Sequence, residues 1–296
     1  MKTPLHGSHV VAASGDPLAI LPVPTLDHVV VNVRDRMEDA SALYRRLGFT
    51  LTPRGHHTLG SINHLAMFGT DYMELLGVPP GDGGRTDVLD WPAGLNGVVF
   101  ATNESDGLHA RLAAAGAPVL PPLAFSRPVD LPGGPRDAAF RVVRLDKPAV
   151  ASGRMFFCHH LTRDVGWRDE WRRHANGVLG IEGIVIAAEQ PETLGALLAT
   201  LFGAESVRPI PGGLRLPMGL SRLDVVTPSE VARRFGPAAP APDGRAERMA
   251  ALVFRAADLD RAAYALAAGG IDAARDAERL LVPAAEAFGV TLAFRG

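Results

Sequence analysis

Apolar runs rich in β-branched residues recur along the chain, and each is followed by a helical pattern that ends near glycine. The first run covers residues 26–33, and its valines predict a strand. In the following residues, 36–47, apolar side chains recur at spacings of three and four, as in an amphipathic helix. Gly48 stands where helices commonly end in glycine. The same order returns three times, as strand and helix pairs at 95–101 and 107–115, 181–187 and 191–202, and 249–254 and 259–268.

Two or three short strand patterns follow each glycine. The first is expected at 49–51, and further ones lie at 63–68, 72–76, 140–145, 155–161, 213–216, 223–226, 279–283 and 290–294. The repeated unit is therefore βαβββ, and one such unit is too small to bury both faces of its sheet. We predict an α+β fold in which four βαβββ modules pair into two cup-shaped mixed β-sheet domains with helices outside.

This pairing divides the chain into an N-terminal module pair at 25–162 and a C-terminal module pair at 181–296. Residues 1–24 have no apolar core of the signal-peptide kind and are expected to form a flexible leader. Residues 163–180 are polar but contain two tryptophans, and we expect them to link the two pairs.

Composition and charge narrow the function classes. The formal net charge is −2, so no general attraction to nucleic acid or to anionic membranes is expected. No apolar run approaches the roughly 20 residues that span a bilayer. Cys158 is the one cysteine, which excludes an intramolecular disulfide and is typical of a reducing compartment. We therefore expect a cytoplasmic protein whose partner is a small-molecule substrate, and a homodimer is compatible with these features.

Histidine is confined to one part of the chain. All ten histidines lie within the first 174 residues. Because histidine is a common metal ligand and acid–base group, this asymmetry suggests one active half and one scaffolding half. In the second half, Glu182 and Asp224 alone would make a poor metal set, and Ala293 offers no ligand. We interpret residues 181–296 as a packing domain, a dimer surface or a wall of the active cup.

Two predicted strands of the first half carry polar residues among apolar ones. Strict alternation places His28 on the same face as Val30, and Asp27 on the opposite face. Glu74 lies mid-strand, where a carboxylate is costly to bury unless it is paired or bound to a metal. From these residues alone, a hydrogen-bonded core histidine and a glutamate paired with arginine remain open alternatives.

Four sequence strings support a family resemblance: LDHVV at 26–30, GSINH at 60–64, YMELL at 72–76 and FFCHHLT at 156–162. Together with the βαβββ repeat, they resemble the vicinal oxygen chelate superfamily, which includes glyoxalase I and the extradiol dioxygenases. The likeness is greatest to the glyoxalase-like branch of that superfamily, and it covers residues from about 24 to the end of the chain.

The resemblance implies a divalent metal in the cup, bound by residues from the first and last strands of paired units. Carried over to this chain, the ligands would be His28, Glu74 and His160, with the adjacent His159 as the alternative to His160. Asn96 and Gly97 stand where a further ligand would come from, so that position looks vacant. Two imidazoles and one carboxylate suit Fe, Mn, Zn or Ni and leave open positions for two substrate oxygens.

Other polar residues of the first half are expected around this metal. Those expected to bind substrate are Asn63, Tyr72, Arg163 and His174. Those expected to move a proton are Glu74 and His64. The nearby His56 and His57 are expected to be solvated loop residues.

The sequence therefore predicts a glyoxalase-like metalloenzyme that acts on a small oxygenated substrate as an isomerase, a lyase or a dioxygenase. The alternative is a metal-free protein that binds or sequesters a small molecule in the same cup. An aromatic lining of the cup would be expected for that alternative.

Overall fold

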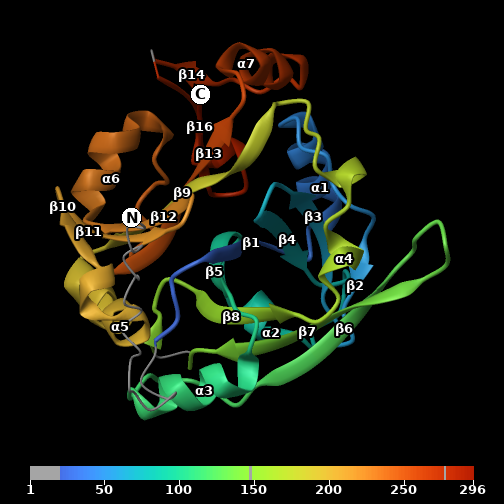
Figure 1. The fold of residues 1–296 in the computed structure, drawn as a ribbon. Coiled ribbons are helices and arrows are strands. Elements are labelled where there is room, and N and C mark those ends of the chain that lie inside the picture. The colour runs from blue at the N-terminus through green and yellow to red at the C-terminus, as the bar shows by residue number, and fades with distance from the viewer. Residues whose placement is uncertain (1–20, 147–148, 277) are drawn as a thin grey trace, which may run out of the picture.

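The computed structural model describes residues 21–146, 149–276 and 278–296, so residues 1–20 of the expected leader lie outside the described part. Two mixed sheets of eight strands each form the body of the molecule (Figure 1). The strands of the first sheet are β1 (Leu26–Arg34), β2 (Gly55–His56), β3 (Ile62–Met67), β4 (Tyr72–Gly77), β5 (Gly94–Ala101), β6 (Leu123–Val129), β7 (Arg136–Arg144) and β8 (Arg154–His160). Their order across the sheet is β2-β3-β4-β1-β5-β8-β7-β6.

The second sheet repeats this arrangement with the C-terminal strands. These are β9 (Val178–Ala188), β10 (Arg208–Ile210), β11 (Gly213–Met218), β12 (Ser221–Val226), β13 (Glu247–Ala256), β14 (Ala274–Arg275), β15 (Arg279–Val282) and β16 (Thr291–Arg295). Their order is β10-β11-β12-β9-β13-β16-β15-β14, which matches the first sheet strand for strand. The predicted α+β fold of four βαβββ modules in two mixed sheets is confirmed.

In the described part of the chain, seven α-helices connect the strands. They are α1 (Met37–Arg46), α2 (Thr86–Leu89), α3 (Ser105–Ala114), α4 (Arg163–Gly166), α5 (Pro191–Phe202), α6 (Pro228–Phe235) and α7 (Leu259–Ala268). Acidic residues in the first turn of α1 and arginines in its last turn complement the helix dipole. Gly48 follows with a φ of +86°, a backbone conformation that glycine adopts without the steric cost of a Cβ. Across the described residues, no helix combines the length and apolarity needed to cross a bilayer.

The strand expected at 49–51 is wrong, because these residues form an irregular segment. The Thr50 N–H donates to Nδ1 of His174 at 3.0 Å, and its hydroxyl donates to the Arg173 carbonyl at 2.6 Å. Side-chain and loop partners thus take the place of a sheet neighbour. Phe49 is meanwhile drawn into the core, which explains why an apolar residue stands there.

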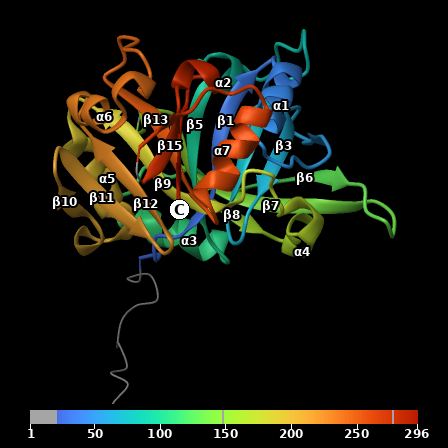
Figure 2. The ribbon, with the colours of Figure 1, turned by 90° about the horizontal axis from the view of Figure 1, so that it is seen from above.

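The two sheets share one hydrophobic core. Phe49 is 3% exposed, and its ring packs at a centroid distance of 5.2 Å against Phe254 of β13 and 6.2 Å against Phe68. Phe100 of β5 contacts Phe202 of α5 at 4.8 Å. The halves accordingly lie side by side, with α1 next to α7 (Figures 1 and 2). The valines of β1 alternate into this shared core, which leaves the other face of the first sheet free to form a site.

Candidate functional site

A cavity of about 220 Å³ lies against the face of the first sheet that points away from the shared core. Its lining combines residues of β1, β3, β4, β6, β7 and β8, so both modules of the N-terminal pair contribute. Most of the lining is apolar, and a few polar side chains converge within it, which is the usual composition of a small-molecule site. The described polar residues that line it include His28, His57, Asn63, Tyr72 and Glu74.

His28 and Glu74 meet in this cavity. They come from the neighbouring strands β1 and β4, and the His28 Nε2 lies 3.7 Å from the Glu74 Oε2. Both side chains are buried. The His28 ring stacks on Tyr72 at a centroid distance of 4.3 Å, and the Asn63 amide donates to the Glu74 Oε1 at 2.7 Å. Each member of the pair is therefore held by a neighbour that also lines the cavity.

Asp27 lies on the same side of β1 as His28, which corrects the face predicted by strict alternation. Leu26 pairs with Phe100 and His28 pairs with Val99, so Asp27 is an extra residue in β1. Such a β-bulge re-aims a side chain and breaks the period of two. The Asp27 Oδ2 lies 2.6 Å from the His28 Nδ1, directly behind the cavity.

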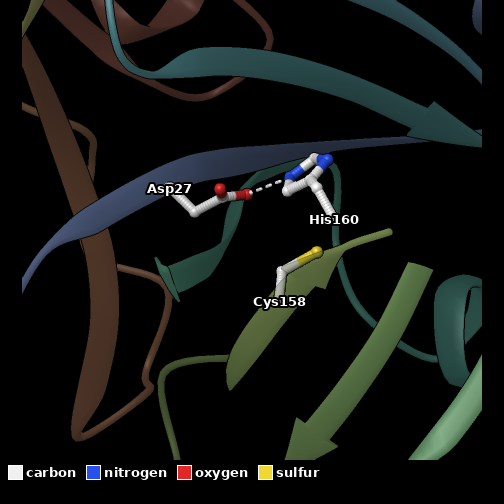
Figure 3. Close-up of side chains that lie close together, drawn as sticks. All are labelled: Asp27, Cys158 and His160. Carbon is white, nitrogen blue, oxygen red and sulfur yellow. Dashed lines mark hydrogen bonds and ion pairs between the residues drawn. The ribbon is translucent and has the colours of Figure 1, made fainter. Parts of the chain in front are cut away.

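Asp27 also binds His160, across from β1 to β8. The Oδ2 of Asp27 lies 2.9 Å from the His160 Nε2, and Cys158 lies beside them on the same strand as His160 (Figure 3). The two imidazoles outweigh burial and hold the pKa of Asp27 at about 2. Asp27 is therefore ionised at neutral pH and accepts a hydrogen bond from each ring.

The structure brings two of the three predicted metal ligands together and places the third behind them. His160 faces the same side of β8 as Phe156 and Cys158, and the adjacent His159 faces the other side. However, His160 does not line the cavity, and its ring is hydrogen-bonded to Asp27 instead. In the described part of the chain, one group of three side chains of the metal-ligating types lies close together. It consists of Asp27, Cys158 and His160, whose ligand atoms all lie within 4.8 Å of one another. Burial raises the pKa of the Cys158 thiol well above its usual value, so without a bound cation this thiol is protonated and is not a nucleophile.

Strand register explains why His28 and Glu74 have no metal-ligating counterparts in the second module. Val30 of β1 pairs with Glu74 of β4, and at the equivalent point Val99 of β5 pairs with Phe156 of β8. Asn96 is the extra residue of β5, as Asp27 is of β1. Gly97 and Phe156 are therefore the counterparts of His28 and Glu74, and neither offers a ligand atom.

His57 is a site residue that the sequence interpretation missed, because a short loop strand gave no periodic signal. It lines the cavity, its Nδ1 lies 2.9 Å from the Ser61 hydroxyl, and its Nε2 lies 3.3 Å from the Asn63 amide nitrogen. A polar row thus runs along the cavity through Ser61, His57, Asn63, Glu74, His28 and Asp27. Burial lowers the pKa of His57 to about 4, so this imidazole is neutral at physiological pH.

The lowered pKa of His57 predicts a pH-dependent stability. In the unfolded chain, His57 binds a proton below its ordinary pKa of 6.5. In the folded chain, its pKa of about 4 means that it binds a proton only at much lower pH. The free energy of unfolding should therefore fall as pH drops from about 6.5 to about 4. His57→Gln should reduce this slope by about 1 kcal/mol per pH unit. Denaturant unfolding at several pH values checks this, with exposed His56→Gln as the control; an unchanged slope in His57→Gln would refute it.

The other predicted site residues lie outside the cavity lining. His64 points to the opposite face of β3 from Asn63, and its Nδ1 binds the Thr52 carbonyl at 2.7 Å. His174 contacts both halves: its Nε2 lies 2.8 Å from the Met67 carbonyl, and Arg261 of α7 donates to the His174 carbonyl at 2.6 Å. The Arg163 guanidinium lies 3.5 Å from the centre of the Trp167 ring. Because side chains alternate along β3, His64 and Asn63 face opposite sides of the sheet, and only Asn63 reaches the cavity. Both ring nitrogens of His174 are occupied by hydrogen bonds to backbone groups.

The equivalent face of the second sheet carries ion pairs in place of an open carboxylate. Val185 pairs with Asp224, which makes Asp224 the counterpart of Glu74. Arg215 donates to both oxygens of Asp224 at 2.6 and 2.8 Å, and Arg234 of α6 adds a third hydrogen bond at 2.7 Å. Phe235 at the end of α6 packs against Val185 and neighbouring residues of the sheet. The carboxylate is thus fully engaged by arginines, although a cavity lined by Gly183, Val185 and Asp224 also lies on this face.

Comparisons with known proteins agree with this architecture. The family model described as "Glyoxalase-like domain" matches residues 26–202. No curated protein matches the sequence. A hypothetical protein from Staphylococcus aureus is similar in structure, with a TM-score of 0.65 and 10% identity over 92% of this chain and 98% of that one.

Two solved structures with named activities share the fold. A xylose isomerase-like TIM barrel/4-hydroxyphenylpyruvate dioxygenase fusion protein has a TM-score of 0.58 and 14% identity, over 95% of this chain and 50% of its own. A mutant of 4-hydroxymandelate synthase from Streptomyces coelicolor has a TM-score of 0.56 and 12% identity, over 93% and 94%. At these identities the likeness concerns the fold alone. The family match covers more than half of the chain, and the protein belongs to the glyoxalase-like domain family of the vicinal oxygen chelate superfamily.

Proposed function

We propose that this protein is a glyoxalase-like enzyme that binds a small oxygenated substrate in the cavity of the first sheet, with a divalent metal held by His28 and Glu74. The observation that carries the proposal is the pair of atoms facing each other there. The His28 Nε2 and the Glu74 Oε2 lie 3.7 Å apart, which is too long for a hydrogen bond.

The protonation of His28 follows from its partner. Asp27 is ionised and can only accept hydrogen bonds, so the proton of a neutral His28 resides on Nδ1. Its Nε2 then presents a lone pair toward the Glu74 carboxylate. Two electron-rich atoms in this position favour a cation between them, and a carboxylate behind a metal-bound histidine is the usual supporting arrangement.

The donor set fits a metal with two protein ligands, and substrate oxygens or water would complete its coordination. When bound, a divalent cation supplies polarisation of a substrate oxygen. Tyr72 fixes the His28 ring by stacking, and Asn63 orients Glu74. Glu74 is then the carboxylate placed to take a proton from the substrate, and the apolar lining limits access of water. This arrangement favours isomerase or lyase chemistry.

Metal analysis tests this proposal and separates two ligand sets. We expect the protein, purified without a histidine tag, to carry about one equivalent of a transition metal, and Glu74→Gln to lose it. His160→Gln should keep the metal, because His160 contacts Asp27 and not Glu74. Loss of the metal in this variant would instead favour the set of three ligands that the family resemblance implies, with His160 as the third. Asp224→Asn, at the equivalent point of the second sheet, is the matched control. Metal-free wild type that cannot be reloaded would contradict the proposal.

The alternative function is a binding protein that performs no reaction, and the lining of the cavity favours it on one point. Tyr72, Phe125, Phe140 and Phe156 all line the cavity, and Phe125 stacks on Phe140 at 5.2 Å. This is the aromatic surface expected for a sequestering protein. Tight binding of an aromatic ligand to metal-free protein, with no turnover in the metal-loaded form, would favour this alternative.

A further inference from the structure

The cavity holds positive charge that the protein itself does not neutralise. Arg127 of β6 lines the cavity and is 3% exposed. Within the described residues it makes no hydrogen bond or ion pair, and its Nε is buried without a partner. Arg154 of β8 also lines the cavity; its Nε donates to the Asn96 Oδ1 at 3.0 Å, and its Nη2 is buried without a partner.

The other charges of the lining offset these two arginines only in part, and Arg144 adds a further positive charge. Arg85 is already held by both oxygens of Asp87, at 2.7 and 2.8 Å. Glu74 is the one other carboxylate in the described lining, and it accepts from Asn63. Arginine stays protonated in proteins, and a buried guanidinium without an acceptor is costly. An anion from outside the chain would supply the missing acceptor.

Gly55 fixes where the Arg127 guanidinium lies. A Cβ added at Gly55 of β2 would come within 2.8 Å of the Arg127 Cδ and 2.9 Å of its Nη1, and would also collide with the Asn63 Oδ1. The guanidinium therefore passes over Gly55 and lies next to the Asn63 side chain. A bound anion would therefore sit beside Asn63, in the middle of the polar row.

The rest of the lining defines the body of the ligand. Phe125, Phe140 and Phe156 surround the cavity together with several leucines and valines. A planar carboxylate matches the paired N–H donors of a guanidinium, and aromatic faces favour an aromatic body. The volume of about 220 Å³ limits that body to a small molecule.

We propose that the cavity binds a small carboxylic acid with an aromatic body, whose carboxylate is held by the guanidinium of Arg127. This assignment rests on the cavity of the proposed function but does not depend on a bound metal. It names the substrate class of that site: an aromatic acid for either an enzyme or a sequestering protein.

Calorimetry with 3-phenylpropanoate and its neutral isostere 3-phenylpropanamide tests the assignment. We expect the acid to bind wild type at least tenfold more tightly than the amide, since hydrogen bonds to a charged group carry that much. Arg127→Met should lower the affinity for the acid ten- to hundredfold and leave that for the amide unchanged. Arg136→Met, on the exposed part of the same hairpin, is the matched control and should bind like wild type. Equal affinity for acid and amide in wild type would overturn the assignment.

Two further arms keep the test decisive. If Arg127→Met fails to fold, Gly55→Ala displaces the guanidinium without removing its charge and should also weaken binding of the acid. Inorganic phosphate should not compete with 3-phenylpropanoate at equal concentration; if it does, the aromatic body is not recognised and the assignment fails. Measurements in excess chelator and in Glu74→Gln separate the two proposals: acid binding without metal supports the carboxylate site alone, and metal binding without preference for the acid supports the metal site alone.

Discussion

Replacing Asp27 with alanine is expected to lower the free energy of unfolding by about 3 kcal/mol at neutral pH. The carboxylate is buried and accepts from both His28 and His160, so its removal leaves two imidazole N–H groups without a partner. The lowered pKa of Asp27 likewise means that its ionised carboxylate stabilises the folded protein. A carboxyl with a pKa of about 2 in the folded chain and 3.8 when unfolded stabilises the fold above pH 4 and loses that contribution as pH falls toward 2.

Denaturant unfolding of wild type and Asp27→Ala between pH 7 and the lowest pH at which wild type still folds measures this effect. The difference between the two proteins should shrink below about pH 4. Asp27→Asn keeps an acceptor oxygen and should lose less stability than Asp27→Ala. A difference that does not change with pH would show that Asp27 acts by size and not by charge. Asp27→Ala removes the acceptor that holds the proton of His28 on Nδ1, so this variant should also weaken metal binding at Glu74.

Replacing Phe49 with alanine should cost about 3 to 5 kcal/mol, the usual range for a large aromatic side chain in a core. Its ring contacts Tyr44 and Phe68 of the first half and Phe254 and Phe294 of the second. The loss should appear in one cooperative transition for both halves, because they share this core. Thermal unfolding followed by calorimetry checks this, with Tyr264→Ala at an exposed position as the control. Two separate transitions in wild type would mean that the halves fold independently.

The spacing of hydrophobic residues predicted the fold because each module repeats the same simple pattern. Valines in β1 and the spacing of apolar residues in α1 each fix one element, and four copies made the pairing into two sheets evident. The segment 49–51 was the exception, since an apolar residue can enter a core without joining a sheet. Helix α6 was also missed, although Pro228 and the Thr227 cap are ordinary helix-start signals.

The site was predictable only where alternation held. His28 and Glu74 share the predicted face, and both line the cavity. Asp27 could not be placed, because a β-bulge leaves no mark in the hydrophobic pattern. Arg127 was missed for a different reason: the chain is rich in arginine, and only a folded structure shows that this guanidinium is buried without a partner.

A crystal structure of the metal-loaded protein with 3-phenylpropanoate tests the central claim most directly. We expect metal density between His28 and Glu74. We expect the ligand in the cavity of the first sheet, with its carboxylate bound to Arg127. The equivalent face of the second sheet, where Arg215 and Arg234 hold Asp224, should remain empty. Metal bound elsewhere, or the acid bound at the second sheet, would contradict the assignment of the first sheet as the active half.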